Sequence, residues 1–285
     1  MRSLHIVGVG LIGGSFALAV KKVYPGVKVY GIDSSNENLN QARQLGIIDE
    51  IAQLEDLGKS EMVYLAIPVD ATCEILPKVL ALVSDETLVI DSGSTKEAIC
   101  DAVRAHGRRR NFLAAHPIAG TEFSGPSAAV GHLFEGKTII ICEVEETAFK
   151  LQERALELFS KIDMRIRYMN PIAHDRHIAY VSHLSHISAF MLGKTVMDKE
   201  KNERDIFDMA GSGFESTVRL AKSSPAMWTP IFKQNKDNVL ETLEGYIANL
   251  IHFKELIKND DYEGVYNDMA STNHIGKILN GIQLT

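Results

Sequence analysis

The sequence predicts an α/β protein in which a doubly wound parallel sheet is followed by an all-α region. Two observations lead to this prediction. From residue 4 to about residue 169, short runs rich in Val and Ile alternate with stretches of helical spacing, which is typical of strands joined by crossover helices. After Asn170 and Pro171, nearly every stretch has helical spacing. We therefore predict two domains, residues 1–169 and residues 170–285.

Seven strands are expected in the first domain, because seven short apolar runs end at polar or glycine-bearing loops. They span residues 4–8, 28–32, 62–67, 87–91, 112–115, 138–142 and 165–168. In the second domain, Pro171 suits the first turn of a helix, where a missing N–H is tolerated. Residues 225–257 carry an apolar stripe and are predicted to form one long helix, broken or bent near Pro230. Such a stripe packs on other helices, here those of a second subunit.

The composition restricts the partners and the compartment. A net charge of -7 argues against nucleic acid as a partner, because phosphate binding needs a basic face. No window approaches the roughly 18 apolar residues of a membrane span, and the N-terminus lacks the pattern of a signal peptide. Cys73, Cys100 and Cys142 are odd in number and far apart, which favours reduced thiols. We expect a cytoplasmic protein without a membrane partner.

A glycine fingerprint follows the first predicted strand. Residues 8–13 read GVGLIG, a GxGxxG motif placed between a strand and an apolar-periodic helix, as in Rossmann-type domains. Gly8 permits the tight turn, Gly10 lets the backbone approach a pyrophosphate, and Gly13 allows close helix packing. Leu11 and Ile12 open the helix, whose unpaired N–H groups attract an anion. The motif predicts a dinucleotide site.

The choice of dinucleotide depends on the end of the second strand. Asp33 lies twenty residues beyond Gly13, where a carboxylate can accept hydrogen bonds from both adenosine ribose hydroxyls and would repel a 2′-phosphate. NAD is therefore predicted over NADP, although Arg43 lies near in sequence. Ile67 and Pro68 end another strand; they fit a loop passing close to the cofactor, and equally an ordinary turn.

Two polar clusters follow predicted strands on the side where open sheets bind ligands. His116 follows the run 112–115 and is the candidate general base, because a histidine is well matched to accept a hydroxyl proton. Ser94 is its candidate companion, donating a hydrogen bond to the same hydroxyl or to the nicotinamide. A structural histidine and an N-capping serine are the alternatives for these two residues.

Polar groups in the helical region indicate a substrate pocket. Ser182 and His186 are four residues apart and share one helix face. Arg219 offers a planar fork for bidentate carboxylate recognition, with a surface salt bridge as the alternative. His174 and His177 add HxxH pairs, but no third ligand completes a tetrahedral site, so no metal is expected.

Together these motifs resemble the prephenate dehydrogenase family: GVGLIGGS, DSGSTK, HPIAGTEFSG, SHLSH and GSGFESTVRLAKSSPAMW. The resemblance implies a Rossmann-type domain followed by an all-helical dimerisation domain, and a homodimer. It also implies NAD-dependent oxidative decarboxylation of prephenate to 4-hydroxyphenylpyruvate in tyrosine biosynthesis. His116 becomes the base for the ring hydroxyl, Ser94 its companion, and Arg219 the holder of the ring carboxylate.

The same resemblance assigns four further residues and leaves alternatives open. His186 and Ser182 would line the pocket, Glu122 would belong to an ionic network, and Trp228 would be an aromatic that can come from the neighbouring subunit. The family often reads GGGF with Asp two residues later, whereas this chain has residues 211–216 as GSGFES. Arogenate is the alternative substrate. A β-hydroxyacid dehydrogenase using a lysine and an NAD-responsive sensing protein are the rival classes.

Overall fold

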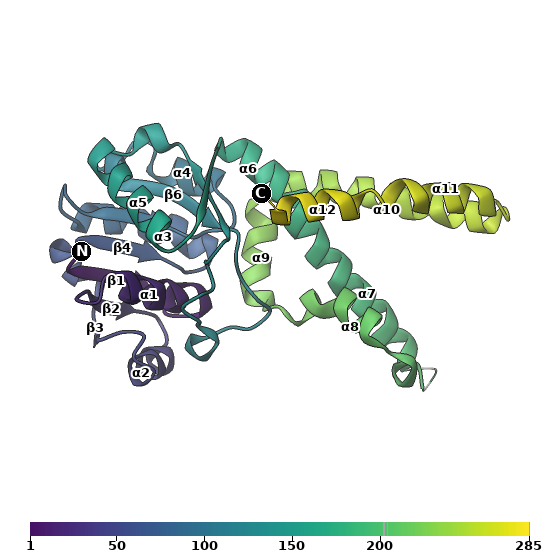
Figure 1. Ribbon diagram of the computed structural model, residues 1–285, viewed down its shortest axis with the longest axis horizontal. Coiled ribbons are helices and arrows are strands. Elements are labelled where there is room, and N and C mark those ends of the chain that lie inside the picture. Colours follow the sequence, from purple (N-terminus) through teal and green to yellow (C-terminus); the bar gives the residue numbers. More distant parts are fainter. Residues whose placement is uncertain (202, 204, 285) are drawn as a thin grey trace. The chain divides into compact units, whose positions relative to one another are not determined.

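The computed structural model describes residues 1–201, 203 and 205–284. The chain divides into two compact units, residues 1–236 and residues 237 onward. The first unit holds a sheet with helices on both faces and a group of further helices, labelled in Figure 1. This arrangement confirms the predicted α/β class with a helical C-terminal part.

One eight-stranded sheet forms the centre of the first unit. Its order is β3-β2-β1-β4-β5-β6-β7-β8. All seven predicted strands are present, and the eighth, β3, has only two residues, too few for a periodic signal. The strands are β1 (Ser3–Val7), β2 (Lys28–Ile32), β3 (Glu50–Ile51), β4 (Met62–Leu65), β5 (Leu88–Asp91), β6 (Phe112–Pro117), β7 (Thr138–Cys142) and β8 (Arg165–Met169).

The sheet departs from a fully parallel arrangement at one edge. Strand β7 pairs antiparallel with β6, with Ala115 opposite Ile141, and β8 runs parallel to β7. Between β6 and β7 the described chain has a 3₁₀ turn, Pro126–Ala128, and no α-helix. A parallel neighbour needs a long crossover, usually helical, so this loop returns the chain in the opposite direction.

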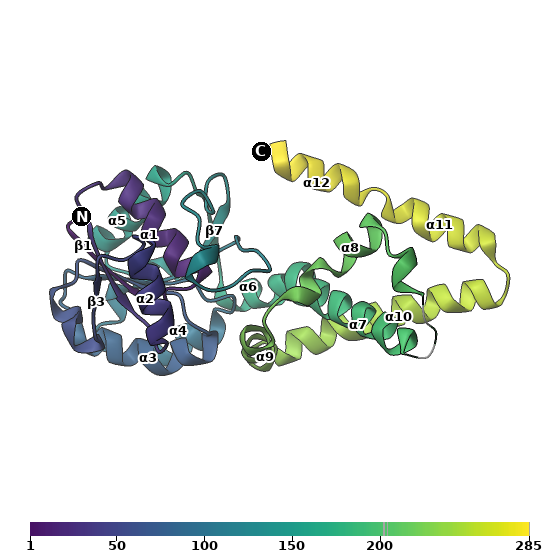
Figure 2. The same ribbon diagram turned by 90° about the horizontal axis from the view of Figure 1, so that it is seen from below.

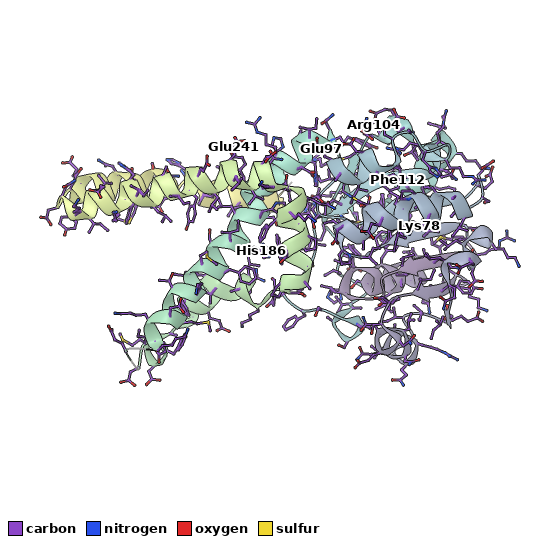
Figure 3. The ribbon with its side chains drawn as sticks, turned by 180° about the vertical axis from the view of Figure 1, so that it is seen from behind. Lys78, Glu97, Arg104, Phe112, His186 and Glu241 are labelled. Atoms are coloured by element: carbon purple, nitrogen blue, oxygen red, sulfur yellow. The ribbon has the colours of Figure 1, made fainter. Side chains whose placement is uncertain are left out.

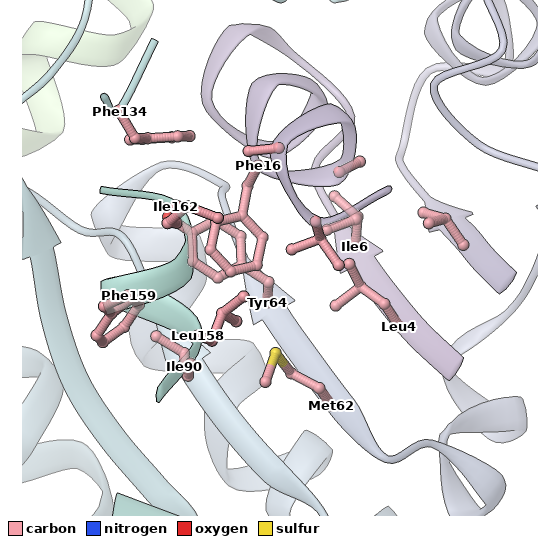
Figure 4. Packing of buried hydrophobic residues seen from close by; sticks show 14 of the residues in the cluster. Leu4, Ile6, Phe16, Met62, Tyr64, Ile90, Phe134, Leu158, Phe159 and Ile162 are labelled. Carbon is pink, nitrogen blue, oxygen red and sulfur yellow. The ribbon is translucent and has the colours of Figure 1, made fainter. Parts of the chain in front are cut away.

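Helices cover both faces of the sheet and bury one apolar cluster on each. Phe16, from α1, stacks on Tyr64 of β4 with ring centroids 3.7 Å apart, and Leu158 and Phe159 of α5 complete this side (Figure 4). On the other face, residues of α3 and α4 pack with Trp228 and Ile231 of α9. The flanking helices are α1 (Leu11–Val23), α2 (Asn36–Gln44), α3 (Val69–Leu82), α4 (Glu97–Val103) and α5 (Phe149–Lys161).

The helical part begins where the sequence predicts. Pro171 occupies the first turn of α6, and the Asn170 side chain caps the helix by accepting from the Ile172 N–H at 2.9 Å. The first unit continues with α6 (Pro171–Ile178), a π-helical turn (Ala179–His183), α7 (Leu184–Glu200), α8 (Ser212–Val218) and α9 (Pro225–Gln234). The second has α10 (Lys236–Lys258), α11 (Tyr262–Thr272) and α12 (Ile275–Leu284), and the chain reverses after α10 (Figure 2).

The predicted long helix over residues 225–257 is two helices, and the break lies at Asn235 instead of Pro230. Pro230 lies in the middle of α9 and does not end it. Asn235 ends α9 with φ -101° and ψ 30°, and its buried side-chain amide donates to the Asp175 carbonyl at 2.7 Å. A tertiary hydrogen bond therefore sets the break. Within the described residues, no helix is long and apolar enough to cross a membrane.

Buried histidines make the stability of the fold dependent on pH. The His5 ring stacks on Tyr30, its Nδ1 lies 2.9 Å from the Ser60 hydroxyl, and burial lowers the pKa of His5 from its usual 6.5 to about 4. Because the folded-state pKa is the lower one, the stabilisation is present above about pH 6.5 and is lost as the pH falls toward 4. We expect His5→Gln to reduce the acid-side loss in unfolding free energy by about 2–3 kcal/mol.

Urea unfolding at several pH values between 7 and 4 measures the slope of the unfolding free energy against pH. It is compared between the unsubstituted protein and His5→Gln. The exposed His252 supplies a matched control, since its Nε2 lies 3.3 Å from an Asp268 oxygen at the surface. His252→Gln should leave the slope nearly unchanged. Identical slopes for His5→Gln and the unsubstituted chain would contradict the burial argument.

Candidate active site

The glycine loop adopts a geometry that only glycine fits. Gly8 has φ +92°, and a Cβ there would lie 2.3 Å from the Ala66 carbonyl oxygen. A Cβ on Gly13 would lie 1.9 Å from the Gly8 carbonyl oxygen, so α1 packs directly on the turn. At Gly10, by contrast, a Cβ would meet nothing within 4 Å. The open side of the loop is therefore at Gly10, where a pyrophosphate would approach.

This loop lies at the switch point of the sheet, because β1 has β2 on one side and β4 on the other. Helix α1 starts at Leu11 and Ile12 with no side-chain cap and no acidic residue in its first turn, which leaves its N-terminus open to an anion. Asp33 accepts from the Val9 N–H at 3.0 Å and from the Ser35 N–H at 2.8 Å. These features fit a dinucleotide.

Ile67 and Pro68 lie after β4, on the other side of the turn. The Ile67 side chain approaches Gly8, where a Cβ would lie 2.8 Å from the Ile67 Cγ2 atom. Pro68 is the N-cap position of α3. A place next to the cofactor loop and an ordinary turn before a helix are thus both satisfied by this segment.

His116 lies near the end of β6, almost completely buried at 9% exposure. Its Nδ1 lies 2.8 Å from the His174 Nε2, and the His174 Nδ1 lies 2.7 Å from an Asp175 carboxylate oxygen. Burial, with His174 and the Lys96 ammonium nearby, lowers the pKa of His116 well below 6.5. The ring is therefore neutral near pH 7, which is the form that accepts a proton.

A buried ion pair holds the strand that carries His116. The Lys96 Nζ contacts the Asp91 carboxylate and donates to the Ala115 carbonyl at 2.8 Å, and both charged side chains are fully buried. Asp91 in turn accepts from the Ala115 N–H at 3.0 Å and from the Gly93 N–H at 2.9 Å. The loop after β5 and the strand β6 are thereby fixed to each other.

Ser94 is half-buried in that loop, and within the described residues its side chain has no hydrogen-bond partner. It does not cap α4. The first amides of α4 instead donate to Asp175, at 2.7 Å from the Lys96 N–H and 3.0 Å from the Glu97 N–H. The structure leaves the Ser94 hydroxyl available for a ligand, with no bond to His116.

A second group of polar side chains comes from α7, α9 and the π-helical turn. His186, labelled in Figure 3, stacks on Trp228 with ring centroids 3.6 Å apart, and its Nδ1 donates to the Ser182 carbonyl at 2.9 Å. His183 is fully buried against the edge of Trp228. The structure thus places Trp228 on His186 of the same chain. The His183 Nε2 and the Trp228 Nε1 are buried and have no hydrogen-bond partner among the described residues.

Arg219 follows α8 and reaches the loop after β6. Its Nη1 donates to the Glu122 carboxylate at 2.9 Å, with the arginine side chain 50% exposed. The Glu122 backbone amide and Arg219 lower the pKa of Glu122. This pair agrees with the ionic network predicted for Glu122. It agrees equally with the surface salt bridge that is the alternative for Arg219. A surface hollow lined by Phe123, Ser127 and Glu122 opens there.

The two groups are joined by residues that the sequence analysis missed. Asn235 contacts both the Asp175 carbonyl and the His183 ring, at 2.7 and 3.2 Å. Burial lowers the pKa of His186, and the charge of Arg219 lowers it further. From the sequence, His174 is considered only as a possible metal ligand, although the carboxylate of the adjacent Asp175 is a signal for another role. No cluster of three metal-binding side chains occurs among the described residues.

A sheet that can bind a dinucleotide at its switch point, with a neutral buried histidine at the end of another strand, is the architecture of a nucleotide-dependent dehydrogenase. The family model of the prephenate dehydrogenase nucleotide-binding domain matches residues 16–168, and that of the prephenate dehydrogenase dimerization domain matches residues 170–271. The chain belongs to the prephenate dehydrogenase family and is an oxidoreductase. The predicted family and enzyme class are confirmed.

Individual relatives agree with the family models. Prephenate dehydrogenase of Bacillus subtilis is 33% identical over 268 residues, covering 93% of this chain and 72% of the relative. The structure of prephenate dehydrogenase from Aquifex aeolicus with hydroxyphenyl propionate and NAD+ is 36% identical, with a TM-score of 0.87 and 96% of each chain covered. Arogenate dehydrogenase of Synechocystis, 24% identical with a TM-score of 0.76 over 97% of this chain and 99% of that one, shares the fold.

Proposed function

We propose that the protein catalyses the NAD-dependent oxidative decarboxylation of prephenate to 4-hydroxyphenylpyruvate, with arogenate as the alternative substrate. The observation that carries the proposal is the neutral, buried His116 on β6 in a chain of this family. The Aquifex relative with NAD+ and a hydroxyphenyl compound bound supports the same cofactor and substrate class.

In this reaction His116 accepts the proton of the ring hydroxyl as the carbinol carbon is oxidised. NAD, when bound, supplies the hydride acceptor. Loss of carbon dioxide from the opposite ring carbon makes the ring aromatic, which drives the reaction forward. Arg219 would hold a substrate carboxylate through the N–H groups that Glu122 leaves free, while Ser94, Ser182, His186 and Trp228 would surround the ring and its side chain.

The deciding assay follows NADH absorbance with purified protein in four combinations, prephenate or arogenate with NAD or NADP. Rapid reduction of NAD with prephenate is expected. Turnover with arogenate alone would change the substrate and keep the base. Silence in all four combinations would overturn the proposal and favour a protein that senses NAD.

The β-hydroxyacid dehydrogenase alternative needs a lysine that can exchange protons at the site. Lys96 lies close to His116, but it is completely buried and already bonded to Asp91 and to the Ala115 carbonyl. These contacts give Lys96 a structural role in holding the loop to β6. The observation favours the histidine mechanism.

Preference for NAD should depend on Asp33. We expect Asp33→Asn to weaken NAD binding roughly 10- to 100-fold, because charge-assisted hydrogen bonds to the ribose are lost. NADP binding should weaken less, since the repulsion of its 2′-phosphate is lost as well. Titration of both nucleotides by calorimetry gives the two dissociation constants. An unchanged ratio of the NAD and NADP dissociation constants would contradict the assignment. The control is Asp70→Asn, at an exposed site on α3.

We further propose a homodimer formed through the helical region, with the domain boundary at residues 169 and 170, and a cytoplasmic location. The second compact unit leaves many large apolar side chains exposed, among them Leu250, Ile251 and Ile278, and so does α7 with Met191 and Met197. Exposure of this extent favours a protein partner. Free Cys73, Cys100 and Cys142 suit a reducing compartment.

A further inference from the structure

A row of three buried side chains leads away from His116. The His116 Nδ1 meets the His174 Nε2 at 2.8 Å, and the His174 Nδ1 meets the Asp175 Oδ1 at 2.7 Å. His174 is 2% exposed and Asp175 is 3% exposed, so water does not compete for these bonds. In each contact, a histidine nitrogen either carries a proton or accepts one, and the hydrogen-bond partner decides which.

The far end of the row can only accept. Asp175 receives the Lys96 N–H on Oδ1 at 2.7 Å and the Glu97 N–H on Oδ2 at 3.0 Å, in addition to His174. An ionised carboxylate has no proton to donate, and each of its oxygens already accepts a backbone amide. The proton between Asp175 and His174 therefore belongs to the His174 Nδ1.

The remaining protons follow from this one. A neutral His174 with its proton on Nδ1 presents a lone pair at Nε2, which accepts the Nδ1–H of His116. The His116 Nε2 is then the bare nitrogen. We propose that Asp175, acting through His174, is a positioning residue that sets the tautomer of His116, so that its Nε2 is the atom that accepts the substrate proton. This inference rests on the proposed function.

The row also explains how a buried base can accept a proton. When the His116 Nε2 takes the hydroxyl proton, the imidazolium still donates its Nδ1–H to His174, which donates to the Asp175 carboxylate. The proton stays on His116, and the fixed negative charge stabilises the cation without a proton moving along the row. Asp175 is held by the start of α4, so this end of the row cannot shift without disturbing that helix.

The tautomer is measurable without any turnover. Two-bond nitrogen–proton correlation spectra of the full-length protein with ¹⁵N-labelled histidine distinguish Nδ1–H from Nε2–H rings, and His116→Gln identifies the His116 signals. We expect His116 to carry its proton on Nδ1, the less common form of a free imidazole. A proton on Nε2, which would mean that His174 is an imidazolium donating in both directions, overturns the proposal.

Matched variants test the row by its hydrogen-bonding capacity. The side-chain oxygen of His174→Gln can still accept the His116 Nδ1–H, whereas His174→Leu cannot. We expect His174→Gln to keep the tautomer and a kcat within about tenfold of the original, and His174→Leu to change the tautomer and lose roughly 10²- to 10⁴-fold in kcat with a smaller change in KM. Equal activity of the two variants would count against the row.

Two further variants separate positioning from folding. Asp175→Leu removes the acceptor of the His174 Nδ1–H, and should let the His116 proton move to Nε2. Its Tm reports the loss of the two bonds at the start of α4. His5→Leu removes a buried histidine that bonds Ser60 instead of the row, and should leave tautomer and kcat unchanged. A His116 with its proton on Nδ1 in a protein inactive in all four assay combinations would support this inference and overturn the proposed function.

Discussion

Replacing His116 by asparagine is expected to lower kcat roughly 10²- to 10⁴-fold, the usual cost of losing a general base. Asparagine can still donate to His174 but cannot accept the hydroxyl proton. Affinity for NAD should change little, because the glycine loop follows β1 whereas His116 lies near the end of β6. Stopped-flow and steady-state rates of NADH formation provide the measurement.

An exposed histidine on the same helix as His174 supplies the control for this experiment. His177→Asn should leave kcat unchanged, since His177 is exposed and lies three residues from His174. Near-normal turnover of His116→Asn would remove His116 from the mechanism. A Tm that falls as far as the rate would instead indicate a structural role for the ring.

Replacing Arg219 by alanine is expected to raise the KM for prephenate roughly 10- to 100-fold with a smaller effect on kcat. A charge-assisted bidentate contact made in both the ground state and the transition state affects mainly binding. The loss also leaves the Glu122 carboxylate without its arginine, and its negative charge then repels the dicarboxylate substrate. Initial rates over a range of prephenate concentrations give both constants.

Lys222 offers the comparison for Arg219, because it lies three residues further on and its Nζ is 3.8 Å from the Glu215 carboxylate. Lys222→Ala should leave KM nearly unchanged. Glu122→Gln should lower KM or leave it unchanged, since it removes a competitor for the guanidinium. An unchanged KM in Arg219→Ala would mean that the contact with Glu122 is an ordinary surface salt bridge.

Features of the fold that depend on a few neighbouring residues could be predicted from the sequence. The GxGxxG turn could be predicted because Gly8 and Gly13 occupy positions where a Cβ has no room, and Pro171 because the first helical turn tolerates its missing N–H. The direction of β7 could not be predicted from its apolar run, which is the same for a parallel and an antiparallel strand. The loop of residues 118–137 decided it.

The features of the candidate site likewise divide into those that the sequence predicts and those that depend on tertiary contacts. The sequence alone determined the family and the dinucleotide loop, and it predicted His116 and Arg219 as site residues, because these residues lie in contiguous motifs whose chemistry depends on residue type and spacing. Only the tertiary structure brought Asp175 to the start of α4, set the helix break at Asn235, and joined His174 to His116 across 58 residues. Hydrogen bonds between distant segments leave no periodic pattern in a sequence, and in this protein such bonds determine which nitrogen of the base is free.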